Sequence, residues 1–269
     1  MFRLHQIQRD LEHPASKDIH VPPHCWVLNI QPWIRDLIGL DSDIPGFMIR
    51  EEYTLALRAA IQFYKGDEQT FRTTTTADEG NDNDAMEIEM GDLLQNPFTK
   101  LPSSLVSTRG GFIVVGHPGI GKHCSPPPKI ETPHPGLGTT AWLHVVLIWR
   151  LQAGLPTIYQ SHPSFLLFFN AEGAFTWHHD WPLNALELWR DIPSSTWCLI
   201  DSNINLTKVP AFITSLCCFI VQAWSPQNEH FTWRDKAGAP VMTYFMKPWS
   251  LTEILSGYVM YYPYIIVPL

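Results

Sequence analysis

The feature that most constrains the fold of this chain is a short apolar run that leads straight into a glycine-rich segment. Residues 111–116 read GFIVVG, and residues 116–122 read GHPGIGK. A β-branched run bounded by glycines predicts a strand that is buried on both faces. The glycine-rich residues fit the phosphate-loop pattern G-x-x-x-x-G-K-[ST] up to Lys122, but the next position holds His123 in place of the required Ser or Thr.

A phosphate loop binds an anion because its small residues let several backbone N–H groups point inward, and because the helix that follows presents its positive end. The lysine adds a charge for the β and γ phosphates, and the hydroxyl after it binds Mg²⁺. Residues 123–138 cannot supply that helix, since they contain five prolines, three of which are consecutive.

We interpret residues 123–138 as an insertion into a standard phosphate loop, for example an unspliced intron. Without them, Lys122 is followed directly by Thr139 and Thr140, which restores the motif as G-K-T-T. The next residues, 140–154, read TAWLHVVLIWRLQAG and predict a helix that is stopped by Gly154. The insertion hypothesis therefore recovers both the hydroxyl and the helix that the motif needs.

The remaining segments predict an α/β fold: a mostly parallel sheet of the P-loop NTPase type, with helices on both faces and an irregular, partly helical N-terminal extension. Short apolar runs predict strands at 157–160, 164–170, 196–201, 216–224 and 241–246. Apolar spacing, capping residues and proline positions predict helices at 48–66, 182–191 and 248–257. In the last of these helices, Ser250 and Glu253 are placed to form a capping box.

We expect four segments in chain order: an N-terminal extension with one amphipathic helix (1–66), an acidic flexible linker (67–104), the P-loop-like domain (105–257) and an apolar C-terminal tail (258–269). The net charge of -8 is concentrated in residues 67–92, which hold nine acidic residues and one basic residue. The rest of the chain is balanced in charge, which argues against a general nucleic-acid-binding surface.

The cellular compartment is predicted from cysteine usage and from the absence of targeting segments. Five cysteines without a C-x-x-C pair suit a reducing compartment. The N-terminal residues contain no apolar stretch typical of a signal peptide, and no apolar run reaches the roughly 18 to 20 residues that a transmembrane helix needs. We therefore expect an intracellular protein, cytoplasmic or nuclear, without a membrane span.

Several segments together resemble a known family. They are GHPGIGK, TTAWLHVVLIWRLQAGLPTIYQ, WCLIDS, FIVQAWSP and YFMKPWSLTEIL. This set is similar to the P-loop ATPase domain of fungal Crinkler and retrotransposon-hot-spot-like proteins, over roughly residues 48–257. The resemblance implies an ATPase-type α/β domain that takes ATP and Mg²⁺ as ligands.

The resemblance also implies roles for particular positions. The phosphate loop would comprise Gly116, His117, Pro118, Gly119, Ile120, Gly121 and Lys122. Thr139 or Thr140 would bind Mg²⁺ if the insertion is looped out or absent, and Asp201 would hold Mg²⁺ through water. Lys122 and Asp201 are then the expected catalytic residues.

A few further positions extend this expected site. Ser225, at the end of FIVQAW, would sense the γ phosphate, and Arg234 or Lys236 would neutralise phosphate charge. Ser202 follows Asp201 at the position where many ATPases of this class place a catalytic Glu. Hydrolysis is therefore a weaker expectation than binding.

Two functions stay open at this point. The first is an ATP-binding protein that either hydrolyses ATP with Mg²⁺ or uses it as a conformational switch. The second is a non-catalytic scaffold that binds another protein and whose nucleotide site has been disrupted by the insertion. A further interpretation, which is not a function, is that no stable protein forms. A metal site at His178, His179 and Asp180 is not expected, because adjacent histidines on a strand point to opposite faces.

Overall fold

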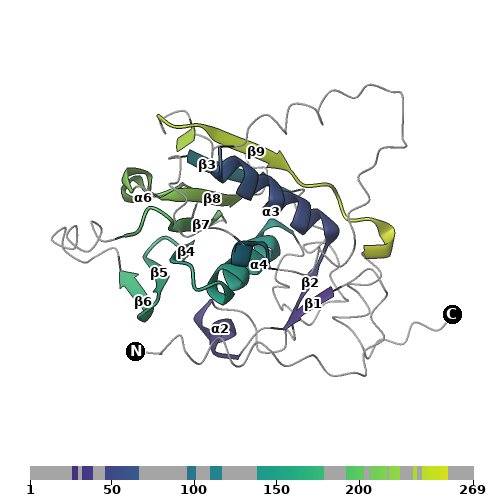
Figure 1. Ribbon diagram of the computed structural model, residues 1–269, viewed down its shortest axis with the longest axis horizontal. Helices are drawn as coiled ribbons and strands as arrows, with labels where there is room; N and C mark the ends of the chain where they lie inside the picture. Colours follow the sequence, from purple (N-terminus) through teal and green to yellow (C-terminus); the bar gives the residue numbers. More distant parts are fainter. Residues whose placement is uncertain are drawn as a thin grey trace, which may run out of the picture.

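The computed structural model describes residues 26–29, 32–38, 46–66, 96–100, 110–116, 138–178, 192–202, 206, 208–216, 218–224, 233–234 and 238–253. Within them lies a seven-stranded sheet with the strand order β6-β5-β4-β7-β8-β3-β9 (Figure 1). The strands are β3 (Gly110–Val115), β4 (Thr157–His162), β5 (Phe165–Asn170), β6 (Gly173–His178), β7 (Trp197–Ser202), β8 (Phe219–Trp224) and β9 (Val241–Phe245).

Most of the sheet is parallel. Each neighbouring pair in the row β4-β7-β8-β3-β9 runs in the same direction. β5 and β6 extend the sheet beyond β4 as antiparallel strands. The described chain therefore has an α/β architecture built on a mostly parallel mixed sheet, as the sequence predicts.

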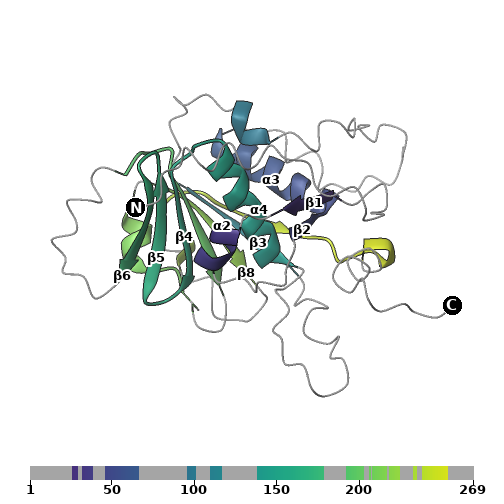
Figure 2. The same cartoon turned by 90° about the horizontal axis from the view of Figure 1, so that it is seen from below.

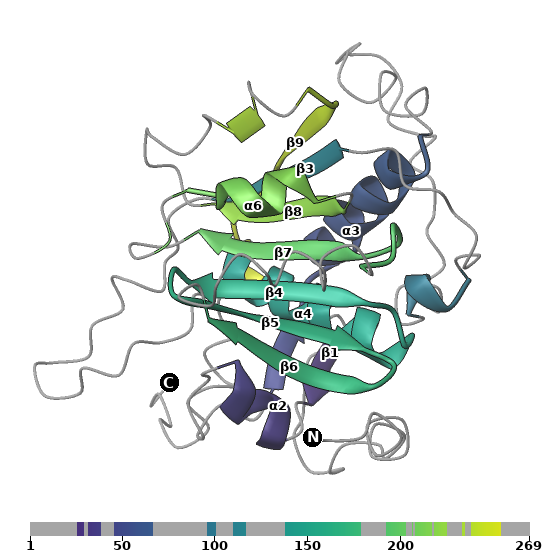
Figure 3. The same ribbon diagram turned by 90° about the vertical axis from the view of Figure 1, so that its left-hand side faces the viewer.

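Helices cover both faces of this sheet. Figures 2 and 3 show α3 (Glu51–Tyr64) and α4 (Thr139–Gln152) on one face, and the short helix α6 (Ala211–Ser215) on the other. The face under α3 and α4 is rich in aromatic side chains. The ring of Tyr64 on α3 lies edge-on to Trp197 and to Phe219, with centroids 5.3 Å and 5.1 Å away. Large aromatic surfaces of this kind contribute much of the apolar burial in a core.

The predicted central elements are confirmed with small shifts in their ends. Helix α4 ends where expected, because Gly154 adopts a left-handed φ of 66° and its N–H bonds to the carbonyl of Leu151. The predicted strand 216–224 begins three residues later, at Phe219. The predicted capping box is present, since the hydroxyl of Ser250 accepts the N–H of Glu253 and the Glu253 carboxylate accepts the N–H of Ser250.

Other elements were not predicted. Residues 1–47 are expected to be irregular, yet β1 (Trp26–Asn29), α2 (Pro32–Leu37) and β2 (Gly46–Ile49) lie within them or at their border. The predicted helix 48–66 begins only at Glu51, because β2 precedes it. The expected acidic linker 67–104 ends in a 3-10 helix, η3 (Pro97–Lys100), and β6 and α6 were also missed. The predicted helix 182–191, the acidic residues 67–92 and the tail 258–269 lie outside the described residues.

The start of α3 is tied to the segment that follows β9. Arg50, directly before α3, is buried and pairs with Glu253 at 2.9 Å. Its guanidinium also donates to the carbonyls of Lys247 and Pro248 and lies 4.4 Å from the ring centre of Trp249. Arg50 thus joins the start of α3 to residues 247–253. None of the described helices is long and apolar enough to cross a bilayer.

Candidate functional site

Three parallel strands end side by side at one edge of the sheet. Val115 on β3 is in register with Trp224 on β8, and Trp224 is in register with Ser202 on β7. The N–H of Gly116 continues this alignment by donating to the carbonyl of Trp224 at 3.3 Å. Because carboxyl ends of parallel strands form the usual ligand crevice in α/β proteins, this edge is the place to look for a site.

The amino end of α4 meets β3 at this edge. A Cβ atom added to Gly116 would lie 2.7 Å from the methyl carbon of Thr139, the first residue of α4. Real Cβ contacts of that length essentially do not occur, so any larger residue at this position would have to displace the Thr139 side chain. The chain leaves β3 at Gly116 and returns at Gly138 to start α4, which brings the two ends of residues 117–137 close together.

A hydrogen bond joins α4 to the neighbouring strand β7. The hydroxyl of Thr140 donates to Oδ1 of Asp201 at 3.0 Å. Thr140 is the second residue of α4, and Asp201 is the second-last residue of β7. The structure therefore selects Thr140 over Thr139 as the hydroxyl next to the acidic residue, while Thr139 contacts Gly116.

Asp201 is a buried carboxyl group with little to balance its charge. It is 7% exposed, and among the described residues no Lys or Arg forms an ion pair with it. Burial raises the pKa of Asp201 from 3.8 to about 6, and the hydrogen bond from Thr140 opposes that rise. A divalent cation bound here would supply the missing positive charge.

The amino end of α4 is held in place by α3. The hydroxyl of Tyr53 donates to the carbonyl of Gly138, the residue before α4, at 3.0 Å. The indole N–H of Trp142 donates to the carbonyl of Tyr53, also at 3.0 Å. These two bonds fix the first turn of α4 against α3, so the backbone N–H groups of that turn stay directed toward the edge of the sheet.

A neutral histidine–tyrosine pair lies deeper under the same helix. His144 on α4 is 3% exposed, and its Nε2 lies 2.7 Å from the hydroxyl of Tyr159 on β4. Burial lowers the pKa of His144 to about 4 and raises the pKa of Tyr159. Both groups are therefore uncharged at neutral pH, which suits a role in packing.

The raised pKa of Asp201 leads to a prediction for Asp201→Asn. In the wild type the proton on Asp201 stabilises the fold fully below the unfolded pKa near 3.8, and this contribution is lost as pH rises through about 6. We expect equal stability of the two proteins near pH 3 and a gain of about 3 kcal/mol for the variant above pH 6.5. Denaturant unfolding at both pH values measures this, and His144 contributes equally to both proteins. An equal gain at both pH values would contradict the assignment.

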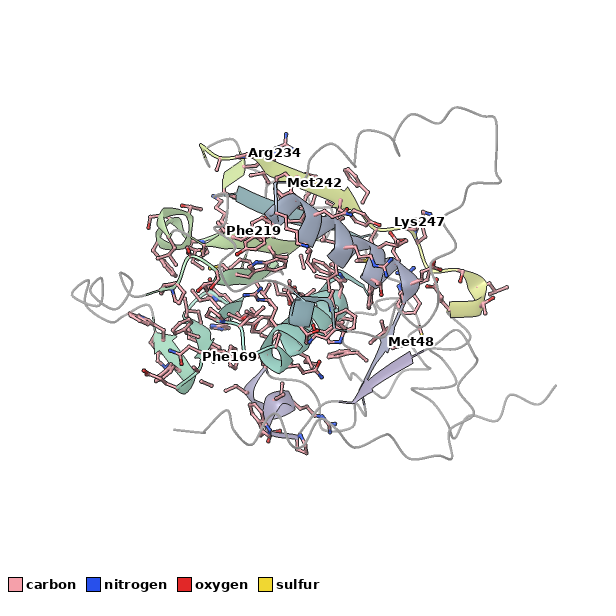
Figure 4. The ribbon with its side chains drawn as sticks, in the orientation of Figure 1. Met48, Phe169, Phe219, Arg234, Met242 and Lys247 are labelled. Atoms are coloured by element: carbon pink, nitrogen blue, oxygen red, sulfur yellow. The ribbon has the colours of Figure 1, made fainter. Side chains whose placement is uncertain are left out.

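The structure brings together some of the predicted site residues and leaves others apart. Gly116, Thr139, Thr140 and Asp201 gather at the carboxyl edge. Arg234 does not join them: Figure 4 shows it beside Met242 near the start of β9, whereas Lys247 follows the other end of that strand. This placement does not support the expectation that Arg234 neutralises phosphate charge, which stays a prediction. The residues His117, Pro118, Gly119, Ile120, Gly121, Lys122, Ser225 and Lys236 lie outside the described part of the chain.

Sequence reasoning missed one polar residue near the site. Gln222 lies in the middle of β8 and is 1% exposed. Its side chain bonds to Ser202 and to Trp233 at 2.6 Å each. The sequence did contain a signal for it: a Gln inside the otherwise apolar run FIVQAW indicates that its side-chain amide has buried hydrogen-bond partners.

Comparisons with known proteins add no further assignment. No protein-family model, curated protein or solved structure matches this chain. Within the described residues, no group of three or more His, Cys, Asp or Glu side chains is arranged to hold a metal ion. A cation at Asp201 would therefore need oxygen ligands from Thr140, water or a bound phosphate.

Proposed function

We propose that this protein binds Mg-ATP at the carboxyl edge of β3, β8 and β7, through a P-loop-type site, and uses it for hydrolysis or for switching. The observation that carries the proposal is the 3.0 Å hydrogen bond between Thr140 and Asp201. It joins the first turn of the helix that follows the glycine-rich segment to the end of a buried strand. A hydroxyl and a carboxylate in these two places are the groups that hold Mg²⁺ beside a triphosphate.

The chemistry of the pair fits Mg²⁺. This ion prefers oxygen ligands and keeps several of its waters, so one hydroxyl and one carboxylate suffice on the protein side. The carboxylate of Asp201 is buried without a cationic partner in the described chain, and its raised pKa reflects that cost. Bound Mg²⁺ would favour the charged form, so nucleotide binding and ionisation of Asp201 should support each other.

Strand order also supports the proposal. β3 precedes the glycine-rich segment, β7 bears Asp201, and β8 lies between them. The chain leaves β3 by α4 on one face of the sheet and connects β7 to β8 by α6 on the other, and ligands of α/β proteins bind where such connections diverge.

One feature favours the second candidate function, a scaffold without nucleotide. In the sequence, a proline-rich segment of sixteen residues, 123–138, separates Lys122 from Thr139. In a phosphate loop the lysine directly precedes the Mg²⁺-binding hydroxyl. If residues 123–138 keep Lys122 away from the first turn of α4, the fold would persist as a surface for another protein while the phosphate site would be lost.

Thermal unfolding with nucleotide tests the proposal. Mg-ATP at about 100 times its dissociation constant should stabilise the native state by roughly 2.7 kcal/mol. For the wild type, the melting temperature should rise strongly with Mg-ATP and less with ATP and a chelator. For Thr140→Val, the rise should be small in both conditions. Thr140→Ser, which keeps the hydroxyl, is the matched control and should behave like the wild type. No shift at any Mg-ATP concentration would favour the scaffold function.

A further inference from the structure

Two cysteine side chains meet on the face of the sheet that α6 covers. Cys198 is the second residue of β7, and Cys218 directly precedes β8. Both are free thiols, both residues are buried, and their Sγ atoms lie 2.7 Å apart. Non-bonded carbon atoms pack at about 3.5–4.0 Å, and sulfur is larger than carbon. The two sulfurs are therefore closer than side chains that only pack against each other.

The fold holds the backbone on both sides of this contact. β7 and β8 are parallel neighbours, and Cys198 is in register with Ile220, two residues after Cys218. The N–H of Phe219 donates to the carbonyl of Thr196 at 3.1 Å, which joins the two chains at the start of the strands. Both thiols belong to the same apolar core cluster. A bond between them would therefore need no change in the register of the sheet.

A disulfide fits this arrangement better than a metal site or a catalytic nucleophile does. A disulfide bond is about 2.05 Å long, so the sulfurs need to approach by less than about 1 Å. Within the described residues, no third His, Cys, Asp or Glu side chain joins the pair to hold a metal ion. Burial raises the pKa of Cys198, and the hydrogen bond with Cys218 adds to that rise, whereas a nucleophile needs an accessible thiolate.

We propose that Cys198 and Cys218 form a redox-modifiable pair that closes to an internal disulfide between the start of β7 and the start of β8. The oxidant is a small disulfide such as oxidised glutathione. One cysteine sulfur attacks this disulfide and releases one glutathione, and the other cysteine attacks the mixed disulfide and releases the second. The cysteines are oxidised, the reagent is reduced to two thiols, and the two protons lost by the cysteines end on those thiols.

The pair is independent of the proposed nucleotide site. Successive side chains of a strand point to opposite faces, so the side chain of Cys198 lies on the opposite face of β7 from that of Asp201. Cys198 is also at the start of β7, whereas Asp201 is near its end. The inference therefore goes beyond the proposed function and stands whether or not the protein binds Mg-ATP.

Access to the thiols depends on α6. The Sγ of Cys218 lies 4.0 Å from the carbonyl oxygen of Ile213 on α6, so this helix covers the pair. α6 has only five residues, and Ala211, Thr214 and Ser215 are exposed. So short a helix opens at a lower free-energy cost than the central strands do. We expect slow oxidation of the folded protein and fast oxidation when the chain refolds with the oxidant present.

The test uses a full-length chain that keeps only this pair, through Cys25→Ser, Cys124→Ser and Cys217→Ser. It is refolded from urea with oxidised glutathione, and a second sample is refolded with dithiothreitol. The oxidised protein should be lighter by two hydrogen atoms and should show no free thiol when it is unfolded. Its melting temperature should be about 5–10 °C higher than that of the reduced protein, because the bond closes a loop of about 20 residues in the unfolded chain.

The matched control is Cys198→Ala in the same background, which should not melt at a higher temperature after the same treatment. In the chain with all five cysteines, peptide mapping after oxidation should find Cys198 bonded to Cys218. Cys217→Ser should keep that bond and Cys218→Ser should lose it, and this mapping decides the question if the serine background does not fold. Free thiols at both positions, a bond from Cys198 to another cysteine or another molecule, or an internal bond that lowers the melting temperature would each overturn the proposal.

Discussion

A protein lacking residues 123–139 should bind Mg-ATP roughly 30- to 150-fold more tightly than the full chain, a difference of about 2–3 kcal/mol. The structure sets the boundary of this deletion. Gly138 precedes α4, and Thr139 and Thr140 are its first two residues. After the deletion, Gly121, Lys122 and Thr140 would take these three places, so the lysine would enter the first turn while the Thr140–Asp201 bond is kept. The energy comes from a charge-assisted contact to phosphate made without ordering a long insert.

The control is a deletion one residue shorter. Removing residues 123–138 leaves Thr139 after Lys122 and shifts the lysine one position away from the first turn of α4. Calorimetric titration of Mg-ATP into both deletion proteins and the full chain should rank the deletion of 123–139 tightest. Equal affinity of the full chain and the longer deletion would mean that the insert does not interrupt the site.

Arg150→Met should destabilise the fold by about 3–5 kcal/mol. Arg150 on α4 is 1% exposed, and within the described residues no carboxylate pairs with it. Its guanidinium lies over the rings of Trp197 and Phe98 and donates to Thr157 Oγ1 and to the carbonyls of Pro156 and Ser195. Burial lowers the pKa of Arg150 to about 9, so it is still charged at neutral pH. Methionine fills part of the space but leaves the two partly buried carbonyls of Pro156 and Ser195 without this donor.

Urea unfolding of matched variants measures this contribution. Arg58→Met on α3 serves as the control, because Arg58 is only half-buried and should change stability by about 0.5 kcal/mol or less. Arg150→Lys keeps the charge but not the planar fork, and should fall between wild type and Arg150→Met. A loss below about 1 kcal/mol for Arg150→Met would show that the ring and carbonyl contacts contribute little.

The central strands and α4 could be predicted because each of these elements follows one local sequence pattern. The run GFIVVG is apolar and bounded by glycines, so β3 could be recognised without knowing its neighbours. β6 could not, because GAFTWH on an edge strand is mostly half-exposed and carries a weak pattern. The short β1 and α2 depend on tertiary packing more than on periodicity, and four or six residues give too little signal.

The place of Asp201 at the end of a buried strand could be predicted from the sequence. The residue that donates a hydrogen bond to it could be predicted only in part. The sequence left Thr139 and Thr140 equivalent, since both follow the insertion directly. Which hydroxyl faces Asp201 depends on where α4 begins, and that is set by the contacts of Tyr53 with Gly138 and Trp142. The link from Gln222 to Ser202 joins residues of two strands that only the sheet order makes neighbours, so no local pattern could reveal it.

The most direct measurement of the central claim is a calorimetric titration of ATP with and without Mg²⁺, in the protein lacking residues 123–139 and in its Thr140→Val variant. If Thr140 and Asp201 hold the metal of a nucleotide complex, Mg²⁺ should raise ATP affinity at least about tenfold, or 1.4 kcal/mol, in the first protein and have little effect in the second. ATP affinity that is the same with and without Mg²⁺ in both proteins would contradict a metal–triphosphate site at this edge of the sheet.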